Sequence, residues 1–401
     1  MIPLPPGQIS PLGLKGIGFP ESLNGQLRYP KSQLKRSSPL IKGGQMDSLV
    51  RRKLIDSAPL DLRVSRRQLL QGAGVVVLAA VSRPTAAFAH DDDEPLGPFG
   101  PWSEPVNLGP VVNSPFEDTH PAISKNGLSL FITSGRPGGV NGANLGRINE
   151  IWVAQRASRD DPWGSPQNLG SVINSVGSNT GVPNLSPDEH LIFFNSGRPG
   201  GCGGADLYVA RRKNKRDDFG WQAPVNLGCT INSAANDNGP TYFADDETDT
   251  VTMFFNSTRP GGIGPENIYA SILGDDGTFG AAVLVPELSS PRVDGRTAIR
   301  RDGLEMLVSS NRLGSIGASN DIWVSTRATT SGAWSTPVNL GPPINSEFDD
   351  GGSALSADGT TLYFYSTRPG GLGGRDLYVA TRHRIHRKGC DDDEHEGCAS
   401  R

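Results

Sequence analysis

Short apolar runs recur along residues 101–385, and each run is bounded by turn residues. Leu191-Ile-Phe-Phe-Asn-Ser196 and Leu362-Tyr-Phe-Tyr-Ser366 are two examples, and such β-branched and aromatic residues are typical of half-buried strands. Pairs such as Asp302-Gly303 between the runs favour tight hairpins, because both central residues of such a turn take positive φ. No segment shows a sustained period of 3.6 residues. The pattern therefore predicts an all-β chain.

A unit of four short strands recurs five times, at spacings of 53–62 residues. Each copy begins with an aromatic residue and a short extended segment, as in 102–109 and 334–341. A short strand follows, then an apolar strand that ends in Ser-x-Arg, then a strand such as 376–382. A β-propeller blade is a four-stranded sheet, so the repeat predicts a single five-bladed β-propeller over 101–385.

The order of strands within the repeat also predicts how the propeller closes. The first segment of each copy is expected to be the outermost strand of the preceding blade. Segment 102–108 then has no preceding blade, and the last blade lacks an outer strand. Pairing the two would remove both unpaired sheet edges, which otherwise invite aggregation.

The repeat motifs resemble those of a known family. Ser-Pro-Asp188, Ser-Ala-Asp-Gly359, Phe-x-Ser-x-Arg-Pro-Gly-Gly and Asp-Leu-Tyr-Val-Ala are similar to the motifs of the TolB-type, WD-repeat-like β-propeller family. The resemblance covers about 285 residues and all five copies, although copy four has Asn311-Arg-Leu-Gly-Ser in place of Arg-Pro-Gly-Gly. It implies the propeller fold but no particular activity, because this repeat recurs in proteins with many roles.

The N-terminal segment has the character of a secretion signal. Ser65-Arg66-Arg67 precedes an apolar run over 72–81, and Ala87-Phe88-Ala89 offers a small-residue cleavage site. This order predicts a twin-arginine signal peptide over 46–89, with Met46 as the start and 1–45 untranslated or disordered. The protein is expected to be exported, periplasmic or extracellular. No membrane span is expected after cleavage, since a spanning helix needs roughly 20 apolar residues.

The sign of the net charge changes at the end of the predicted signal peptide, at residue 89. Residues 1–89 carry 13 Lys and Arg against 4 Asp and Glu, whereas 90–401 carry 25 against 38, a net charge of −13. An acidic exported part disfavours nucleic acid as a partner and fits cations or neutral polymers better. Residues 90–100 are expected to be an acidic linker, and 386–401 an acidic tail bracketed by cysteines.

Four cysteines are present, and export would allow them to form disulfides. Cys202 and Cys229 lie at the same end of one predicted blade, so we expect a disulfide between them. Cys390 and Cys398 bracket a run of acidic residues, and we expect them to close that tail, with weak metal binding by the tail as the alternative.

Acidic and amide residues stand near the start of the innermost strands. Propeller symmetry is expected to place them at the mouth of the central channel, where carboxylate oxygens could bind calcium or sugar hydroxyls. The alternative is that these side chains cap their own loops. The candidate ligand-binding residues are Asp118, Asp237, Asn238, Asp294, Asp349 and Asp350, and the candidate metal ligands are Asp118, Asp294 and Asp350.

One arginine recurs in every blade, after the Ser-x that ends the second strand. We expect these arginines to be structural, each forming an ion pair with the acidic or amide residue that opens the next strand of its blade. The arginines are Arg136, Arg198, Arg259, Arg312 and Arg368, and the expected acidic partners include Asp206, Asp321 and Asp376.

Two classes of function fit these features. The regular repeat favours a non-enzymatic binding or scaffold module with a protein or polysaccharide partner, because enzymes on propellers generally break the symmetry. The alternative is a carbohydrate-active hydrolase, which needs a pair of carboxyl groups flanking the scissile bond. Asp118, Asp294 and Asp350 could supply such a pair at the channel mouth. The nearby irregularities are His120, Arg296 and Glu287.

Overall fold

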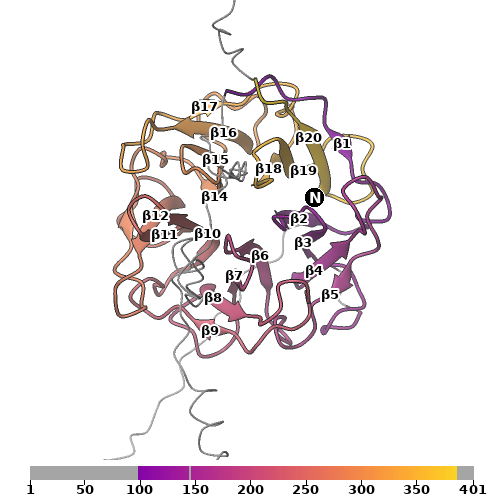
Figure 1. The fold of residues 1–401 in the computed structure, drawn as a ribbon, viewed down its shortest axis with the longest axis horizontal. Helices are drawn as coiled ribbons and strands as arrows, with labels where there is room; N and C mark the ends of the chain where they lie inside the picture. Colours follow the sequence, from indigo (N-terminus) through magenta and orange to yellow (C-terminus); the bar gives the residue numbers. More distant parts are fainter. Residues whose placement is uncertain (1–97, 144–145, 386–401) are drawn as a thin grey trace, which may run out of the picture. The chain divides into compact units, whose positions relative to one another are not determined.

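The computed structural model describes residues 98–143 and 146–385. These residues form five four-stranded antiparallel sheets, arranged around a common axis as the blades of a propeller (Figure 1). The described residues contain no helix, and so no helix long and apolar enough to cross a membrane. The predicted all-β fold with five blades is confirmed. The predicted segments 1–45 and 46–89, most of the linker and the tail, with Cys390 and Cys398, lie outside the described residues.

Each blade is ordered from its innermost to its outermost strand. Blade 1 contains β2 (Asp118–Ile123), β3 (Ser129–Ser134), β4 (Glu150–Gln155) and β5 (Gln167–Asn168). Blade 2 contains β6 (Thr180–Leu185), β7 (Leu191–Ser196), β8 (Asp206–Arg211) and β9 (Val225–Asn226). Blade 3 contains β10 (Asp237–Asp245), β11 (Thr250–Ser257), β12 (Asn267–Ile272) and β13 (Val283–Leu284). Blade 4 contains β14 (Asp294–Ile299), β15 (Glu305–Ser310), β16 (Asp321–Thr326) and β17 (Val338–Asn339).

The fifth blade closes the propeller. It combines β18 (Asp350–Leu355), β19 (Thr361–Ser366) and β20 (Asp376–Thr381) with β1 (Val106–Asn107) from the other end of the chain. β1 pairs antiparallel with β20, and the Arg382 guanidinium lies 3.9 Å from the ring centre of Phe99 and 4.4 Å from that of Trp102. The predicted closure by the N-terminal strand is confirmed.

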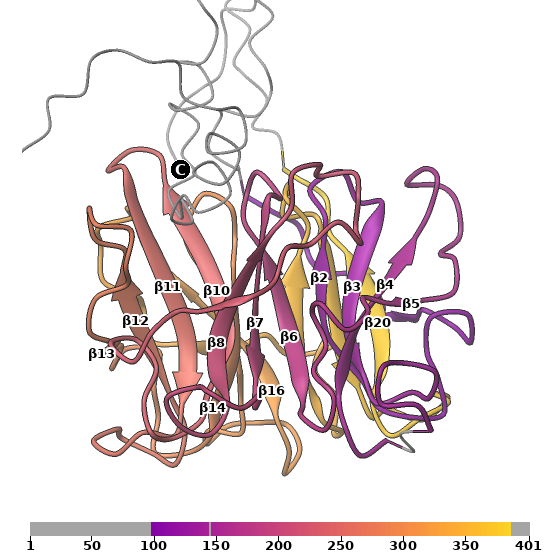
Figure 2. The ribbon, with the colours of Figure 1, turned by 90° about the horizontal axis from the view of Figure 1, so that it is seen from below.

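The core lies between neighbouring blades. Figure 2 shows the blades standing side by side, with their inner strands running from one face of the propeller to the other. One buried cluster joins Phe131 of blade 1 to Phe194 and Tyr208 of blade 2, and Trp221 packs edge-on against Phe131. Burial of these large side chains makes each blade depend on its neighbours, since a single blade exposes both of its apolar faces.

The innermost strand of every blade is bulged. In each blade the register between the innermost and second strands shifts near the third residue of the innermost strand. In four blades that third residue has a positive φ, and two of the four are not glycine: His120 at 48° and Val182 at 56°. A β-branched residue in this region is a strained outlier, and such strain is typical of functional sites. The bulge therefore marks the inner wall of the channel as the place to search for a site.

Removal of residues 98–109 should test the closure. The deletion leaves the outer edge of β20 unpaired and removes Phe99 and Trp102 from Arg382. We expect the melting temperature to fall by about 10 °C or more, with new aggregation through the exposed edge. Deletion of residues 1–89 is the control and should leave the melting temperature unchanged. Equal melting temperatures for the two deletions would contradict a closing role for β1.

Candidate functional site

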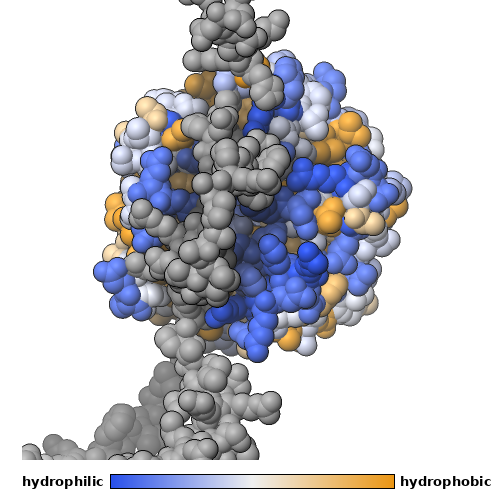
Figure 3. Space-filling model, in the orientation of Figure 1, coloured by the Kyte–Doolittle hydropathy of each residue, from blue (hydrophilic) through white to orange (hydrophobic). Residues whose placement is uncertain are grey.

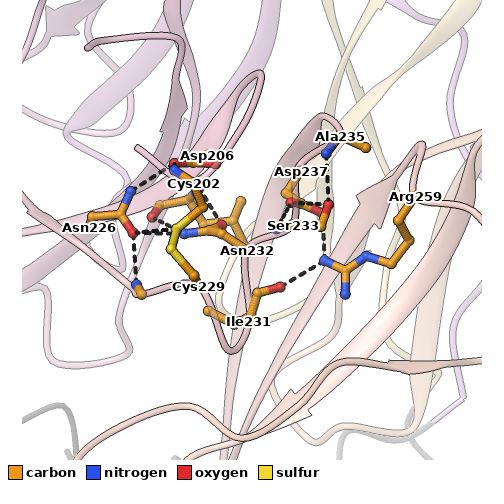
Figure 4. The surroundings of a disulfide bond; sticks show 12 residues. Cys202, Asp206, Asn226, Cys229, Ile231, Asn232, Ser233, Ala235, Asp237 and Arg259 are labelled. Atoms are coloured by element: carbon orange, nitrogen blue, oxygen red, sulfur yellow. Dashed lines mark hydrogen bonds and ion pairs between the residues drawn. A yellow bond between two sulfur atoms is a disulfide. The ribbon is translucent and has the colours of Figure 1, made fainter. Parts of the chain in front are cut away.

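Four blades contain a buried ion pair between the Ser-x-Arg arginine and the aspartate that opens the innermost strand. Each of these aspartates is 0% exposed. Each arginine also donates to a carbonyl of the loop that enters its blade, as Arg259 Nη2 does to the Ile231 oxygen at 2.7 Å (Figure 4). The pairs are Arg136–Asp118 at 2.5 Å, Arg259–Asp237 at 2.6 Å, Arg312–Asp294 at 2.6 Å and Arg368–Asp350 at 2.9 Å.

The predicted partners of these arginines were therefore wrong. Asp206, Asp321 and Asp376 lie beneath the Gly-rich loops and accept hydrogen bonds from loop amides, such as Ile316 N to Asp321 at 2.6 Å and Leu372 N to Asp376 at 2.6 Å. Each also accepts from an asparagine of the outermost strand. The carboxylate of the third strand binds the Gly-rich loop of its own blade. The arginine therefore pairs with the aspartate of the innermost strand.

The candidate metal ligands Asp118, Asp294 and Asp350 are the carboxylates of these ion pairs. Asp350 is representative: one oxygen accepts from Arg368, and the other accepts from the backbone N and the hydroxyl of Ser346. Burial raises the pKa of Asp118, and the Arg136 charge opposes that rise. Among the described residues, no group of three or more His, Cys, Asp or Glu side chains is placed to hold a metal ion. These carboxylates act as loop caps, and calcium binding remains an untested prediction.

The remaining sequence candidates separate into two roles. Asp237, not Asn238, is the counterpart of Asp118 in blade 3, because Ser233 N and Oγ donate to it as Ser114 donates to Asp118. The length of β10, Asp237–Asp245, distinguishes it from the other innermost strands, which have six residues each. Asn238 lines the central cavity instead. Asp349 does not line the cavity; it lies 2.7 Å from Arg375 Nη2 and accepts a hydrogen bond from Asn320, which does line it.

Blade 2 departs from the ion-pair pattern. Thr180 stands in place of the aspartate, and Arg198 bonds the Ile173 oxygen and the Ser196 hydroxyl without a carboxylate. The same blade contains a disulfide between Cys202 of the Gly-rich loop and Cys229 beyond β9, the pair that the sequence indicated (Figure 4).

A cavity of about 260 Å³ lies on the propeller axis. All five innermost strands contribute to its wall, through residues such as His120, Val182, Asn238, Arg296 and Gly352. The second layer of the wall comes from the neighbouring strands and loops. Its polar members are Asn256, Glu266, Ser309, Asn320 and Tyr365.

The cavity is not symmetric, although the blades around it are. The bulge position holds His120, Val182, Gly239, Arg296 and Gly352 in turn. The two glycines make room for larger groups: a Cβ at Gly239 would lie 2.3 Å from Asn256 Oδ1, and one at Gly352 would lie 2.6 Å from the Tyr365 ring. The chemical character of the cavity therefore comes from the positions at which the five repeats differ in sequence.

Glu266 is the carboxyl group of this cavity, and sequence reasoning missed it. It stands just before β12, and its carbonyl accepts the backbone N–H of Asp294 at 3.0 Å. Burial raises the pKa of Glu266, the Asn256 amide that donates to it opposes the rise, and the Asp294 charge adds to it. The signal in the sequence was divergence, because the equivalent residues of the other blades are Asn149, Ala205, Asn320 and Arg375.

His120 and Tyr365 form the opposite side of the cavity, with ring centres 5.6 Å apart. Burial lowers the pKa of His120 to about 3, with further lowering by the charges of Arg296 and Arg375. Burial also raises the pKa of Tyr365. Both side chains are therefore neutral at neutral pH and act as hydrogen-bonding groups.

No protein-family model matches the chain, and no curated protein matches it. Among solved structures, a GH62 hydrolase in complex with xylotriose aligns at 11% identity and a TM-score of 0.48, over 69% of this chain and 97% of that chain. An α-L-arabinofuranosidase from Lactobacillus brevis aligns at 15% identity and 0.46, over 69% and 92%. TolB from Acinetobacter baumannii aligns at 14% identity and 0.38, over 66% and 54%. These likenesses concern the fold alone, and membership of the TolB-type family stays a prediction.

The comparisons correct the main functional interpretation of the sequence. A non-enzymatic binding or scaffold module was inferred from the regularity of the repeat, but the structural neighbours are mostly glycoside hydrolases. The regularity of the repeat therefore gave no ground for excluding catalysis. The cavity adds a second reason, because its wall breaks the symmetry that the repeat displays. The interpretation as a non-enzymatic module was wrong.

Replacement of the Ser-x-Arg arginine should lower the free energy of unfolding less in blade 2 than in the other blades. Arg312→Met leaves the buried Asp294 carboxylate without its counter-charge, and we expect a loss of about 3–5 kcal/mol in the free energy of unfolding. Arg198→Met is the matched control, and it should cost about 1–2 kcal/mol because it removes hydrogen bonds and ring contacts but leaves no buried carboxylate without its counter-charge. Denaturant unfolding measures both, and equal losses would contradict the dominance of the ion pair.

Proposed function

We propose that the protein is a carbohydrate-active hydrolase that binds its saccharide in the central cavity, with Glu266 as the general acid. The observation that carries this proposal is the carboxyl of Glu266, which lines the cavity and whose pKa is raised by burial. Glycoside hydrolysis needs a carboxylic acid that keeps its proton until it can deliver it to the leaving oxygen, and burial is how proteins prepare one.

Asp349 is proposed as the second carboxylate. Arg375 Nη2 at 2.7 Å and Asn320 Nδ2 at 3.0 Å hold its carboxylate. Asn320 itself lines the cavity, so the amide connects Asp349 to the space that a substrate would fill. An ion-paired carboxylate suits the second role in this chemistry, as nucleophile or as base toward a water molecule.

The rest of the wall supports a saccharide as ligand. Amides such as Asn256 and Asn320 and the phenol of Tyr365 can exchange hydrogen bonds with sugar hydroxyls, and the Tyr365 ring offers an apolar face. The predicted twin-arginine signal fits such a substrate, because export would bring the enzyme to polymers outside the cytoplasm.

Conservative variants of the two carboxyl groups should abolish most activity. Glu266→Gln and Asp349→Asn are each expected to lower kcat/KM by about 10²–10⁴-fold, because each removes a proton-transfer or nucleophilic group. Aryl arabinofuranosides and xylosides, xylotriose and acidic xylo-oligosaccharides form the substrate panel. Glu347→Gln is the matched control, since Glu347 is exposed two residues before Asp349. Hydrolysis that survives both variants, or a wild-type protein inactive on the whole panel, would overturn the proposal.

The pH dependence supplies an independent test of Glu266. Its folded-state pKa lies above the ordinary 4.5, so kcat/KM should fall as the pH rises through that raised value. The stabilising contribution of Glu266 is complete below 4.5 and is lost as the pH rises through the same pKa. In Glu266→Gln the corresponding decline of the melting temperature should disappear. A melting temperature with the same pH dependence in both proteins would contradict the raised pKa.

A further inference from the structure

Arg296 carries a charge in the cavity that the proposed chemistry does not use. It belongs to β14, is 4% exposed, and lines the cavity. Nη2 donates to the Pro183 oxygen at 2.9 Å and to the Pro121 oxygen at 3.3 Å, on the innermost strands of blades 2 and 1. The side chain therefore reaches across the channel from blade 4.

The rest of the guanidinium is unsatisfied. Nε and Nη1 of Arg296 are buried and have no hydrogen-bond partner among the described residues. A buried polar group without a partner is costly, and native structures rarely leave one without a ligand or water. A purely structural brace between strands would explain Nη2 alone and would leave the other two nitrogens without a reason.

No carboxylate in the described part of the chain forms an ion pair with Arg296. Other buried arginines show the contrast: Arg212 lies 2.6 Å from Asp218, and Arg382 lies 2.8 Å from Glu305. Glu266 lines the same cavity, but burial governs its pKa and no arginine lowers it. Burial lowers the pKa of Arg296 to about 9, which still leaves the guanidinium charged at neutral pH. The cavity therefore holds a positive charge that lacks its anion.

The volume restricts what that anion can be. A cavity of about 260 Å³ falls just below the 300–1,000 Å³ usual for small-molecule sites. It can hold a single small ligand or the end of an oligosaccharide, whereas a nucleic acid or a folded partner is too large. The other polar wall groups, Asn256, Asn320 and Tyr365, are neutral and suit hydroxyls.

We propose that Arg296 binds a carboxylate in the central cavity, and that this carboxylate belongs to an acidic sugar of the uronic acid type. The second half of the inference rests on the proposed function, since it names the class of saccharide that the hydrolase takes. The first half concerns binding alone. Oxygen atoms of the carboxylate would accept from Nε or Nη1 of Arg296, while the sugar hydroxyls meet the neutral groups of the wall.

Calorimetric titration of the Glu266→Gln protein measures binding without turnover. The three probes are D-glucuronate, D-glucose and acetate. We expect glucuronate to bind at least tenfold more tightly than either of the others, because it alone supplies both the carboxylate and the hydroxyls. Equal affinity for glucuronate and glucose would overturn the anion site. Acetate binding as tightly as glucuronate would support the anion site and overturn the acidic sugar as its ligand.

Variants of Arg296 test whether the preference for glucuronate depends on this side chain. Arg296→Gln should reduce the preference for glucuronate over glucose to about one, whereas Arg296→Lys should keep part of it. If Arg296 only braced the strands and bound no ligand, the ratio of the affinities for glucuronate and glucose would be the same with Arg, Gln or Lys at position 296. If Arg296→Gln does not fold, the shift of the wild-type melting temperature by glucuronate relative to glucose decides the question.

The two proposals fail in different ways. Hydrolysis of neutral oligosaccharides by a protein that shows no preference for glucuronate would overturn the acidic substrate and leave the hydrolase standing. Binding of glucuronate through Arg296 by a protein that hydrolyses nothing in the panel would do the reverse.

Discussion

The buried arginine–aspartate pair is the interaction on which one whole face of the propeller depends. In four blades it joins the end of the second strand to the start of the innermost strand, and the same arginine holds a carbonyl of the incoming loop. Removing two charges from water is expensive unless nearly every donor and acceptor is used. Here the serine hydroxyl, the loop amide and the carbonyl complete the set, so the loops are held in one arrangement.

The strands and the loops held by these ion pairs form a rigid frame, and the residues that line the central cavity are not part of it. The frame repeats because every blade has the same loops to hold, whereas the cavity is lined by positions that the frame leaves free to vary. His120, Glu266 and Arg296 occupy such positions in blades 1, 3 and 4. A propeller of similarly built blades thus carries different groups around one axis, which is the condition that acid and base chemistry requires. Blade 2 shows how much the frame tolerates, since it lacks the carboxylate but carries the disulfide.

The sequence predicted the frame well because the frame is what repeats. Strand order, blade number and the closing strand all followed from apolar runs and turn residues at regular spacing. The cavity could not be predicted in the same way. Glu266 and Asn320 belong to no repeated motif. In blades 1, 4 and 5 the sequence also offers each arginine two carboxylates, one on the innermost strand and one on the third strand, and it does not choose between them. Asp237 and Asn238 were equal candidates in the sequence, and only the structure separates the loop cap from the residue that lines the cavity.

The closure of the fifth blade brings the two ends of the described chain together, with Ile385 N donating to the Pro98 oxygen at 2.7 Å. Any mechanical load applied through the N-terminal and C-terminal extensions enters and leaves the propeller through that one blade. His120, Glu266 and Arg296 belong to other blades, whereas Gly352 and Tyr365 of the cavity wall belong to the blade that bears the load. A pull on either extension would therefore reach the cavity first through the wall formed by Gly352 and Tyr365, and only through the contacts between blades on the sides of Glu266 and Arg296.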